Sequence, residues 1–161
     1  MITHPFPPLF DKNSKILILG SFPSVKSREQ NFFYGHPQNR FWKVISAVLE
    51  AKTPATIPEK REFLLSHGIA LWDVIASCEI TGSSDSSIKN AKANDILPIL
   101  ESANIRKIFV NGKTAEKYYN KYTRDAVGRD AVCLPSTSPA NAAWSIERLT
   151  EAWRNAILQK G

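Results

Sequence analysis

The stretch FFYGHPQNRFW, residues 32–42, joins stacking surface and hydrogen-bonding groups in one place. Five of its eleven residues are aromatic, and the others include a His, a Gln, an Asn, an Arg and a Gly-His-Pro turn. Such a stretch is too polar for a core strand and too aromatic for an ordinary surface loop. It is therefore the first candidate for chemistry in this chain, and it lies directly before a helical pattern.

Several common catalytic motifs are absent from the sequence. There is no Walker loop, no G-x-G-x-x-G and no G-x-S-x-G, which argues against a nucleotide cofactor and against a common α/β hydrolase. The three histidines, His4, His36 and His67, lack metal-ligand spacing. The two cysteines, Cys78 and Cys133, lack the paired spacing of a zinc site, and we interpret them as small buried thiols. These absences favour chemistry that runs on neutral polar groups, without a cofactor or a metal.

Four short apolar runs are typical of strands that are buried on both faces of a parallel sheet. They cover residues 15–20, 69–75, 107–112 and 130–136. Helical patterns alternate with them at residues 41–49, 58–67, 95–103 with Asn94 as its cap, 113–122 and 146–157. This alternation predicts a three-layer α/β/α sandwich around a short, mostly parallel four-stranded sheet. We expect a single domain over residues 1–161, in which residues 1–14 form an extended arm.

Ligands of such sheets bind beyond the carboxyl ends of the strands. The segments that follow the predicted strands are rich in small or polar residues: GSFPS, DVIASCEITGSSDSS, NGKTA and PSTSPAN. The longest expected loop covers residues 77–93 and is a candidate binding loop.

The composition, 43% apolar and 22% charged, is that of a soluble globular protein, and the formal net charge is +6. Seven Lys or Arg and three acids lie between residues 106 and 130, which is compatible with nucleic acid and equally with a solvated helix face. The apolar runs are too short to cross a bilayer, and residues 1–15 lack the order of a signal peptide. We therefore expect a cytoplasmic protein without a membrane partner.

Five motifs occur in order: GSFPS (20–24), YGHPQNRFWKV (34–44), LWDV (71–74), NGKTA (111–115) and LPSTSPANA (134–142). In this order the chain resembles the uracil-DNA glycosylase superfamily over nearly its whole length, and most closely the hypoxanthine-DNA glycosylases. The resemblance implies an enzyme that flips hypoxanthine out of double-stranded DNA and hydrolyses the N-glycosidic bond, leaving an abasic site. No lysine stands out as a Schiff-base nucleophile, so we expect a monofunctional enzyme, and we expect a monomer.

Two positions depart from the superfamily's pattern. The third position of the first motif commonly holds an Asp or Asn that orients or activates the attacking water, and here it is Phe22. The last motif often begins with a His that stabilises the departing uracil anion, and here it begins with Leu134. Conventional uracil excision should therefore be weak or absent. The hypoxanthine-specific branch uses an Asn inside the His-Pro-x-Asn-Arg segment, so the resemblance implies that Asn39 is the catalytic residue.

A neutral carboxamide such as that of Asn39 is a poor base at neutral pH. Its amide oxygen can still hold a water near C1′ of the sugar, where bond cleavage creates an oxocarbenium-like centre. Alternatively, Asn39 caps the helix that begins at Arg40 or Phe41, and both roles can coexist. Arg40 itself is either a phosphate contact or a charge on the helix face.

A flipped base needs an aromatic face and hydrogen bonds along its edge. Phe22 is the first stacking candidate, and Phe33 and Tyr34 are weaker ones. By resemblance, Asp73 takes the position of the Asn that reads the base edge in uracil-specific relatives, and its carboxylate can accept N1–H of hypoxanthine, a donor that adenine lacks. Asp73 can equally cap a turn after its strand. His36 either donates to a base oxygen or a phosphate, or is held by its own turn.

In relatives the last motif enters the minor groove and helps to push out the base. The residues that are expected to contact DNA there are Ser136, Thr137, Ser138, Pro139 and Asn141. Gly112 and Lys113 can meet a phosphate at a helix N-terminus. The basic stretch around them then becomes an electrostatic footprint, and DNA binding should weaken with salt.

Two other functions remain open. A glycosylase of the same fold can act more broadly, on uracil or xanthine as well. Alternatively, the chain is a catalytically inert DNA-binding module, which the apolar residues Phe22 and Leu134 favour and which Asn39, inside an otherwise intact segment, opposes.

Overall fold

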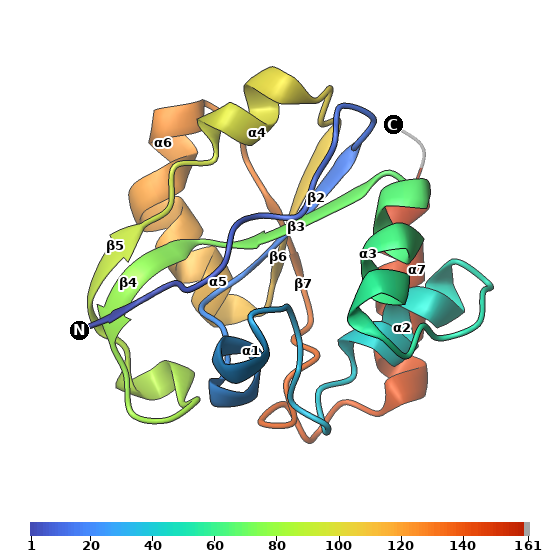
Figure 1. Ribbon diagram of the computed structural model, residues 1–161, viewed down its shortest axis with the longest axis horizontal. Coiled ribbons are helices and arrows are strands. Elements are labelled where there is room, and N and C mark those ends of the chain that lie inside the picture. The colour runs from blue at the N-terminus through green and yellow to red at the C-terminus, as the bar shows by residue number, and fades with distance from the viewer. Residues whose placement is uncertain (160–161) are drawn as a thin grey trace.

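The computed structural model describes residues 1–159, and its centre is a four-stranded parallel sheet in the order β3-β2-β6-β7 (Figure 1). The strands are β2 (Ile16–Gly20), β3 (Ile69–Asp73), β6 (Lys107–Asn111) and β7 (Val132–Leu134). Each lies inside one of the predicted apolar runs, and every neighbouring pair is parallel. The runs are unbroken because both faces of the sheet are covered.

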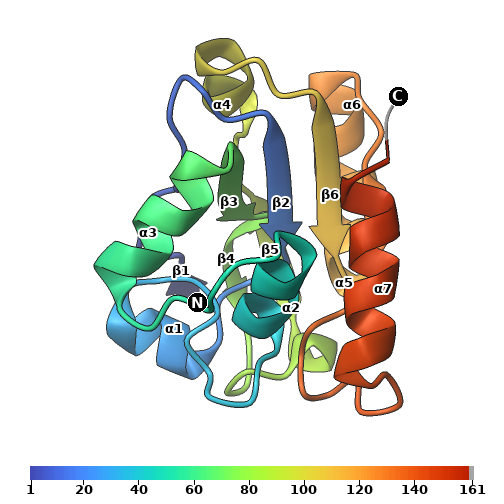
Figure 2. The ribbon, with the colours of Figure 1, turned by 90° about the vertical axis from the view of Figure 1, so that its right-hand side faces the viewer.

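Three helices cover one face of this sheet: α2 (Phe41–Val48), α3 (Ile57–Ser66) and α7 (Ile146–Ile157) (Figure 2). Alternate strand residues, among them Ile18, Leu71 and Phe109, are buried in the core beneath these helices. Phe41 of α2 and Trp153 of α7 meet edge-on, with ring centroids 5.8 Å apart. The apolar stripes predicted for α2 and α7 are thereby confirmed.

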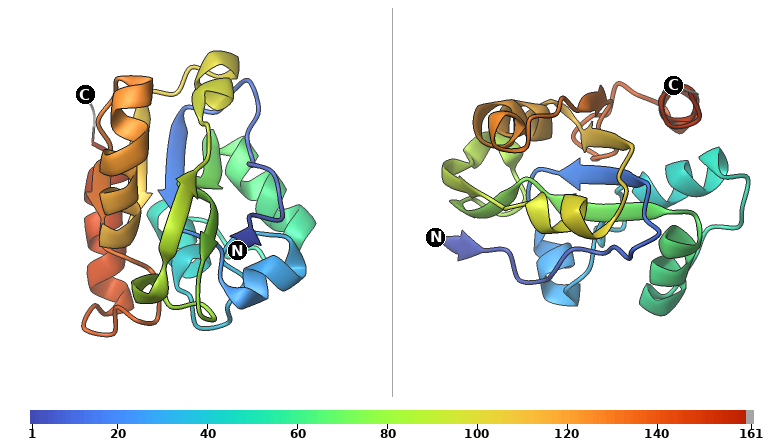
Figure 3. Two further views of the ribbon diagram at one scale, coloured as in Figure 1. Left: turned by 90° about the vertical axis from the view of Figure 1, so that its left-hand side faces the viewer. Right: turned by 90° about the horizontal axis from the view of Figure 1, so that it is seen from above.

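The opposite face is covered by α4 (Leu97–Ser102), by α5 (Lys113–Tyr118) and by a small antiparallel sheet in the order β1-β4-β5 (Figure 3). The strands of this small sheet are β1 (Ile2–Thr3), β4 (Ile75–Glu79) and β5 (Lys89–Ala93). Helix α5 continues through the π-helical turn η2 (Tyr119–Thr123) into α6 (Arg124–Val127). The arrangement is the predicted three-layer sandwich. No helix within residues 1–159 is long and apolar enough to cross a membrane.

The small sheet and two short helices, α1 (Val25–Gln30) and η1 (Asp85–Ser87), were not predicted. The expected loop 77–93 contains the end of β4 and all of β5, so its interpretation as a loop is wrong. The sequence of β5, KNAKA, has no apolar residue larger than Ala. Its extended form therefore comes from backbone pairing with β4, which a local hydrophobic pattern does not reveal.

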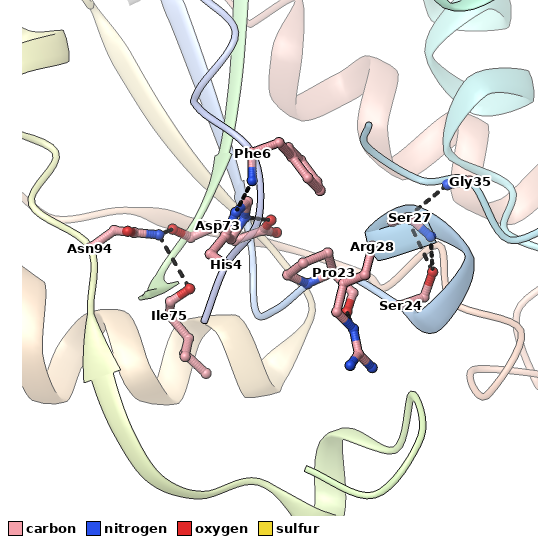
Figure 4. Close-up of polar contacts among 10 residues, drawn as sticks. All are labelled: His4, Phe6, Pro23, Ser24, Ser27, Arg28, Gly35, Asp73, Ile75 and Asn94. Carbon is pink, nitrogen blue, oxygen red and sulfur yellow. Dashed lines mark hydrogen bonds and ion pairs between the residues drawn. The ribbon is translucent and has the colours of Figure 1, made fainter. Parts of the chain in front are cut away.

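Asn94 does not cap α4, contrary to expectation. The helix begins at Leu97 with Ile96 at its N-cap, and Pro98 lies in the first turn as expected. The side-chain amide of Asn94 instead donates to the carbonyls of Asp73, at 2.9 Å, and Ile75, at 3.2 Å (Figure 4). It therefore holds the point at which the chain leaves β3 and enters β4.

The N-terminal arm is attached to the domain at two places. Ile2 and Thr3 pair with β4, and the backbone of Leu9 exchanges two hydrogen bonds of 2.9 Å with Leu71. Between these attachments the N–H of His4 donates to the carbonyl of Ala76 at 2.7 Å. The path of the arm past the carboxyl end of β3 is thus fixed by backbone hydrogen bonds on both sides.

Candidate active site

Three small or polar residues end the central strands on one face of the sheet: Gly20 of β2, Asp73 of β3 and Asn111 of β6. Gly20 and Asp73 are register partners. Each of the three lies two residues beyond a core residue of its own strand and so projects to the same face. The carboxyl edge of the sheet therefore carries a polar layer directly beyond the apolar core.

Asn39 lies just before α2, and hydrogen bonds fix the orientation of its carboxamide. Oδ1 accepts the backbone N–H of Phe41 and the hydroxyl of Thr137, each at 2.9 Å. Because a backbone N–H can only donate, the atom that faces Phe41 must be the oxygen. Nδ2 has no hydrogen-bond partner within residues 1–159 and is not among the enclosed polar atoms. The carboxamide therefore presents its N–H groups as the free end.

This geometry changes the role expected for Asn39. An amide oxygen has two lone pairs, and both already have donors, so the oxygen is not free to hold a water near a sugar. The group left for a substrate is a donor, not an acceptor. The alternative role at the helix is met only in part: the N-cap of α2 is Arg40, which makes no side-chain capping bond, and Asn39, one position earlier, accepts the first N–H of the helix, that of Phe41.

A directional chain of hydrogen bonds leads from β6 to Asn39. The N–H of Thr137 donates to Oδ1 of Asn111 at 3.1 Å, which leaves Nδ2 of Asn111 to donate to the Thr137 hydroxyl at 3.0 Å. The proton of that hydroxyl is then available for Oδ1 of Asn39. Thr137 is completely buried, and hydrogen bonds in series polarise one another away from water. The chain therefore makes the free N–H of Asn39 a better donor.

Tyr34 lies beside this chain with its hydroxyl at the polar layer. Nδ2 of Asn111 donates to the phenol oxygen at 3.2 Å, and the ring stacks on Phe41 with centroids 4.1 Å apart. The backbone of Tyr34 is left-handed, with φ of 52°, a conformation that persists in non-glycine residues where the surroundings impose it. Burial raises the pKa of Tyr34, and the charge of Asp73 raises it further, so the phenol keeps its proton. Because Phe41 covers one ring face, the hydroxyl is the part of Tyr34 that serves the site.

Asp73 is only 5% exposed, and one of its carboxylate oxygens has a fixed partner. Nε2 of His4 lies 2.7 Å from Oδ2 (Figure 4). The other oxygen, Oδ1, lies over Gly20, where an added Cβ would stand 2.3 Å from it and 3.3 Å from the Tyr34 hydroxyl. Only glycine at position 20 allows this approach. Within residues 1–159 the carboxylate accepts no backbone N–H, which does not fit the alternative turn-capping role.

Phe22 is largely covered in the structure. It is 7% exposed, the guanidinium of Arg28 lies over its ring at 5.7 Å, and His4 meets it edge-on with centroids 6.0 Å apart. A base that stacks on the face of this ring covered by Arg28 would displace the guanidinium. His36 is held by its own turn, since Nδ1 accepts the backbone N–H of Gln38 at 3.1 Å, and its Nε2 has no hydrogen-bond partner within residues 1–159.

Arg40 has neither of the two roles expected of it. Its guanidinium donates to the backbone carbonyls of Ser138 at 2.9 Å, of Asn141 at 3.1 Å, and of Trp144. Its own backbone N–H donates to the carbonyl of Thr137 at 3.1 Å. The last motif has no regular secondary structure in this stretch, so Arg40 fixes its shape against the start of α2.

Most residues expected to contact DNA remain accessible. Lys113 and Pro139 are exposed, and Asn141 is half-buried. Ser136 and Ser138 accept backbone N–H groups at 3.1 Å and 3.2 Å, and among the described residues their hydroxyl protons have no acceptor, so they can donate to a ligand. The tip of the last motif therefore offers a proline between neutral donors.

Two of the expected DNA contacts do not fit the structure. Thr137 is completely buried, and its hydroxyl serves Asn39 instead of a phosphate. The backbone N–H of Gly112 donates to the carbonyl of Leu134 at 2.9 Å and is not open to a phosphate. Gly112 has another reason to be glycine: its φ is 97°, and an added Cβ would stand 2.9 Å from Cβ of Ser136.

Asp85 is an acid near the site that sequence reasoning missed. The hydroxyl of Ser21 donates to its Oδ1 at 2.9 Å. Burial of the carboxyl group raises the pKa of Asp85, the Ser21 hydrogen bond opposes this, and the charge of Asp73 raises it further. Nothing in the serine-rich segment 81–87 distinguishes this Asp from an ordinary surface acid.

His4 and Asn111 were also missed. Asn111 could have been found from the alternation along β6, because it lies two residues beyond the core residue Phe109. His4 carries no such signal, since its partner Asp73 is 69 positions away in the chain.

A hollow of about 640 Å³ lies away from these residues, lined by segments 11–15 and 62–68. It is at the amino ends of β2 and β3, and ligands of parallel sheets bind at the other edge. This hollow is therefore not part of the candidate site, which lies at the carboxyl ends of the strands. Within residues 1–159, no group of three or more His, Cys, Asp or Glu side chains is placed to hold a metal ion.

Comparisons with known proteins identify the family of this chain. The family model described as the uracil DNA glycosylase superfamily matches residues 7–160. A hypoxanthine DNA glycosylase from Methanosarcina acetivorans is 35% identical over 153 residues, and one from Methanosarcina barkeri is 32% identical over 154; both matches cover 94% of this chain and 96% of the relative. A solution NMR structure of a candidate uracil DNA glycosylase from Methanosarcina acetivorans is 34% identical, with a TM-score of 0.81 over 98% of this chain and 96% of that one. This chain belongs to the uracil DNA glycosylase superfamily.

Proposed function

We propose that this protein is a monofunctional DNA glycosylase that removes hypoxanthine from double-stranded DNA and leaves an abasic site. The observation that carries the proposal is the Asn39 carboxamide, whose oxygen is committed and whose N–H groups are free at the carboxyl edge of the sheet. The two relatives named hypoxanthine DNA glycosylase, at 35% and 32% identity over nearly the whole chain, support the choice of substrate.

In the proposed reaction, the bond from C1′ to N9 of the purine breaks and its electron pair leaves with the base. The oxygen of a water adds to C1′, and one proton of that water ends on the base. Asn39 donates an N–H to the departing purine, where negative charge develops, and this contact strengthens as the bond breaks. An oxocarbenium-like C1′ accepts water without a strong base, so apolar Phe22 at the superfamily's usual water-orienting position is compatible with the reaction.

Recognition of the flipped base falls to the polar layer. Oδ1 of Asp73 can accept N1–H of hypoxanthine, and adenine has only a lone pair at that atom. The Tyr34 hydroxyl and Nε2 of His36 are donors near the same edge of the sheet and can serve the 6-oxo group. Ser136, Ser138 and Asn141 can hold phosphates while Pro139 enters the space that the base leaves.

The function can be tested with labelled duplexes that carry hypoxanthine, uracil, xanthine or only normal bases, incubated with the protein and then cleaved at abasic sites with alkali. We expect scission at hypoxanthine after alkali and none before it, because the enzyme is monofunctional. No scission at hypoxanthine would favour the inert DNA-binding module.

Asn39→Ala should lower the single-turnover rate on hypoxanthine by about 100-fold or more, since one donor to a developing charge is worth that much. Its affinity for the duplex should stay close to that of the wild type. Asn104→Ala is the matched control, because Asn104 is exposed at the amino edge of the sheet. Equal rates for the Asn39 variant and the control, with circular dichroism unchanged, contradict the role given to Asn39.

A broader glycosylase is the second candidate, and the free acceptor on Asp73 favours it. Uracil and xanthine also carry a ring N–H that such an acceptor can bind. Comparable rates on uracil or xanthine in the same assay would support this wider substrate range.

We also propose that the protein acts as a monomer in the cytoplasm. Sedimentation of the protein with and without a hypoxanthine duplex tests the stoichiometry, and a 2:1 complex would contradict it.

A further inference from the structure

The N-terminal arm brings His4 into a closed aromatic setting next to Asp73. The rings of Phe6, Phe22 and Trp72 meet His4 edge-on, with centroids at 4.5, 6.0 and 6.3 Å. The side chains of His4 and Asp73 are 3% and 7% exposed. A hydrogen bond in such surroundings is shielded from water, and the loss of either partner leaves a buried polar group unpaired.

Two contacts fix which nitrogen of His4 carries the proton. The backbone N–H of Phe6 points at Nδ1 from 3.4 Å, so Nδ1 accepts (Figure 4). Nε2 must then carry the proton, and it donates to Oδ2 of Asp73 at 2.7 Å. This hydrogen bond occupies Oδ2 and thereby fixes the rotation of the carboxylate group.

The second carboxylate oxygen of Asp73, Oδ1, is the one that His4 does not contact. Within residues 1–159, Oδ1 has no hydrogen-bond partner and is not among the enclosed polar atoms. It lies over Gly20 and beside the Tyr34 hydroxyl, in the polar layer that contains Asn111. A carboxylate held in this way offers one acceptor to the site and no donor.

We propose that His4 is a positioning residue that makes Asp73 a fixed hydrogen-bond acceptor for the ring N–H of the flipped base. The inference rests on the proposed function. It adds His4 as the residue that positions Asp73 and so helps the site to select bases that carry a ring N–H. Without the His4 donor, the buried carboxylate loses the contact that fixes its rotation, and Oδ1 no longer has a set position toward the ring N–H of the base.

The test compares excision of hypoxanthine with excision of N1-methylhypoxanthine, which lacks the N1–H. The ratio of the two single-turnover rates measures the contact to N1–H, because other effects of a variant act on both substrates. In the wild-type protein we expect a ratio of about 100 or more, as for other sites that bind a substrate N–H by a buried polar group.

His4→Phe keeps an aromatic ring in the same setting but removes the donor, and it should lower this ratio by about tenfold or more. His4→Gln restores an N–H close to the position of Nε2 and should recover most of the ratio. Phe6→Leu is the control for packing of the arm and should leave the ratio unchanged. Duplex affinity should stay within about twofold in all three variants, because the side chains of His4 and Phe6 are buried and are not placed to meet a phosphate.

An unchanged ratio in His4→Phe overturns the inference about His4. It leaves the proposed function intact, provided that the wild-type protein excises hypoxanthine. An equal fall in His4→Phe and Phe6→Leu also overturns it, because packing alone would then explain the effect. A direct measurement needs no DNA: nitrogen NMR should find the His4 proton on Nε2 and not on Nδ1. The opposite tautomer overturns the inference even if the protein cuts no hypoxanthine, whereas inactivity of the wild type overturns the proposed function.

Discussion

Thr137 has a single hydroxyl group with two fixed partners, so its removal isolates the chain of hydrogen bonds that ends on Asn39. Thr137→Val keeps the shape of the side chain but removes the partner of one N–H of Asn111 Nδ2 and of one lone pair of Asn39 Oδ1, while the other N–H of Asn111 still donates to Tyr34. We expect kcat on hypoxanthine to fall about 10- to 100-fold and the free energy of unfolding to fall by about 1–3 kcal/mol.

The control for Thr137 is Thr137→Ser, which retains the hydroxyl and should recover most of kcat. Chemical denaturation measures the change in stability, and single-turnover kinetics measures the chemical step. A valine variant that works at the wild-type rate would show that Asn39 needs no support from Asn111.

The ionisation of Asp85 should make the stability of the folded protein depend on pH. Because burial raises its pKa above the ordinary value of 3.8, the folded protein favours the protonated acid. Its stabilising contribution is therefore complete below the ordinary pKa and is lost as the pH rises through the raised pKa. Asp85→Asn should raise Tm at neutral pH, and the gain should vanish in acid below the ordinary pKa.

The expected gain is small, because Asp85 as a residue is exposed and solvent screens its charge. Asp125→Asn, at another exposed acid, is the control. An Asp85 variant that raises Tm equally at all pH values would mean that ionisation of this carboxyl group is not responsible.

The residues of the site differ in how far the sequence reveals them. Asn39 was found through a motif, but which of its atoms is free depends on Thr137, 98 positions away. Asp73 was found in the same way, whereas its partner His4 lies in a proline-rich arm without a pattern. Chemistry that depends on a contact between distant residues leaves no mark on either local sequence.

Among the elements, the segment from Ser138 to Trp144 is held by Arg40, whose guanidinium reaches three of its carbonyls, together with hydrogen bonds from Asn141 and Arg148. Arg40→Lys replaces a planar group that reaches three carbonyls by one ammonium that cannot reach them all. We expect a loss of about 1–3 kcal/mol in the free energy of unfolding, together with faster proteolysis inside this segment.

The matched control for Arg40 is Arg61→Lys, since Arg61 is exposed on α3. Mass spectrometry of the proteolytic fragments identifies the cut. Cleavage that is no faster in Arg40→Lys than in the control would contradict the role of Arg40 as the support of the last motif.

At the same scale, local pattern predicted the elements whose burial is local. The runs that became β2, β3, β6 and β7 are apolar because the sheet has two covered faces. Strand β5 was not predicted, because its residues are polar and its form is set by β4. The helical stretch after β6 was predicted, but its π-helical turn has no signal that apolar periodicity detects.

The whole molecule carries a formal net charge of +6, and Lys113 lies at the same edge as the last motif. A phosphate contact by Lys113 releases about one counterion, so Lys113→Gln should reduce the slope of log K against log salt by about 1. The measurement is fluorescence anisotropy of a duplex over a range of salt concentrations.

Lys12→Gln changes net charge by the same amount at the opposite edge of the sheet, in the turn next to the remote hollow. It should leave the slope nearly unchanged. Equal slopes for the two variants would mean that only net charge, and no placed contact, attracts the DNA.

The hydrogen bond between Asn39 and Thr137 also has a consequence for how the protein loses and gains activity. It joins two loops whose residues are 98 positions apart in the chain. The loop that contains Thr137 follows β7, a strand of only 3 residues. A chain in which β7 and α7 have come loose still holds the three other parallel strands, yet its Asn39 has lost the partner that orients it. Such a chain keeps much of its sheet but no longer orients Asn39, so measurements of activity and of secondary structure report on different parts of the fold.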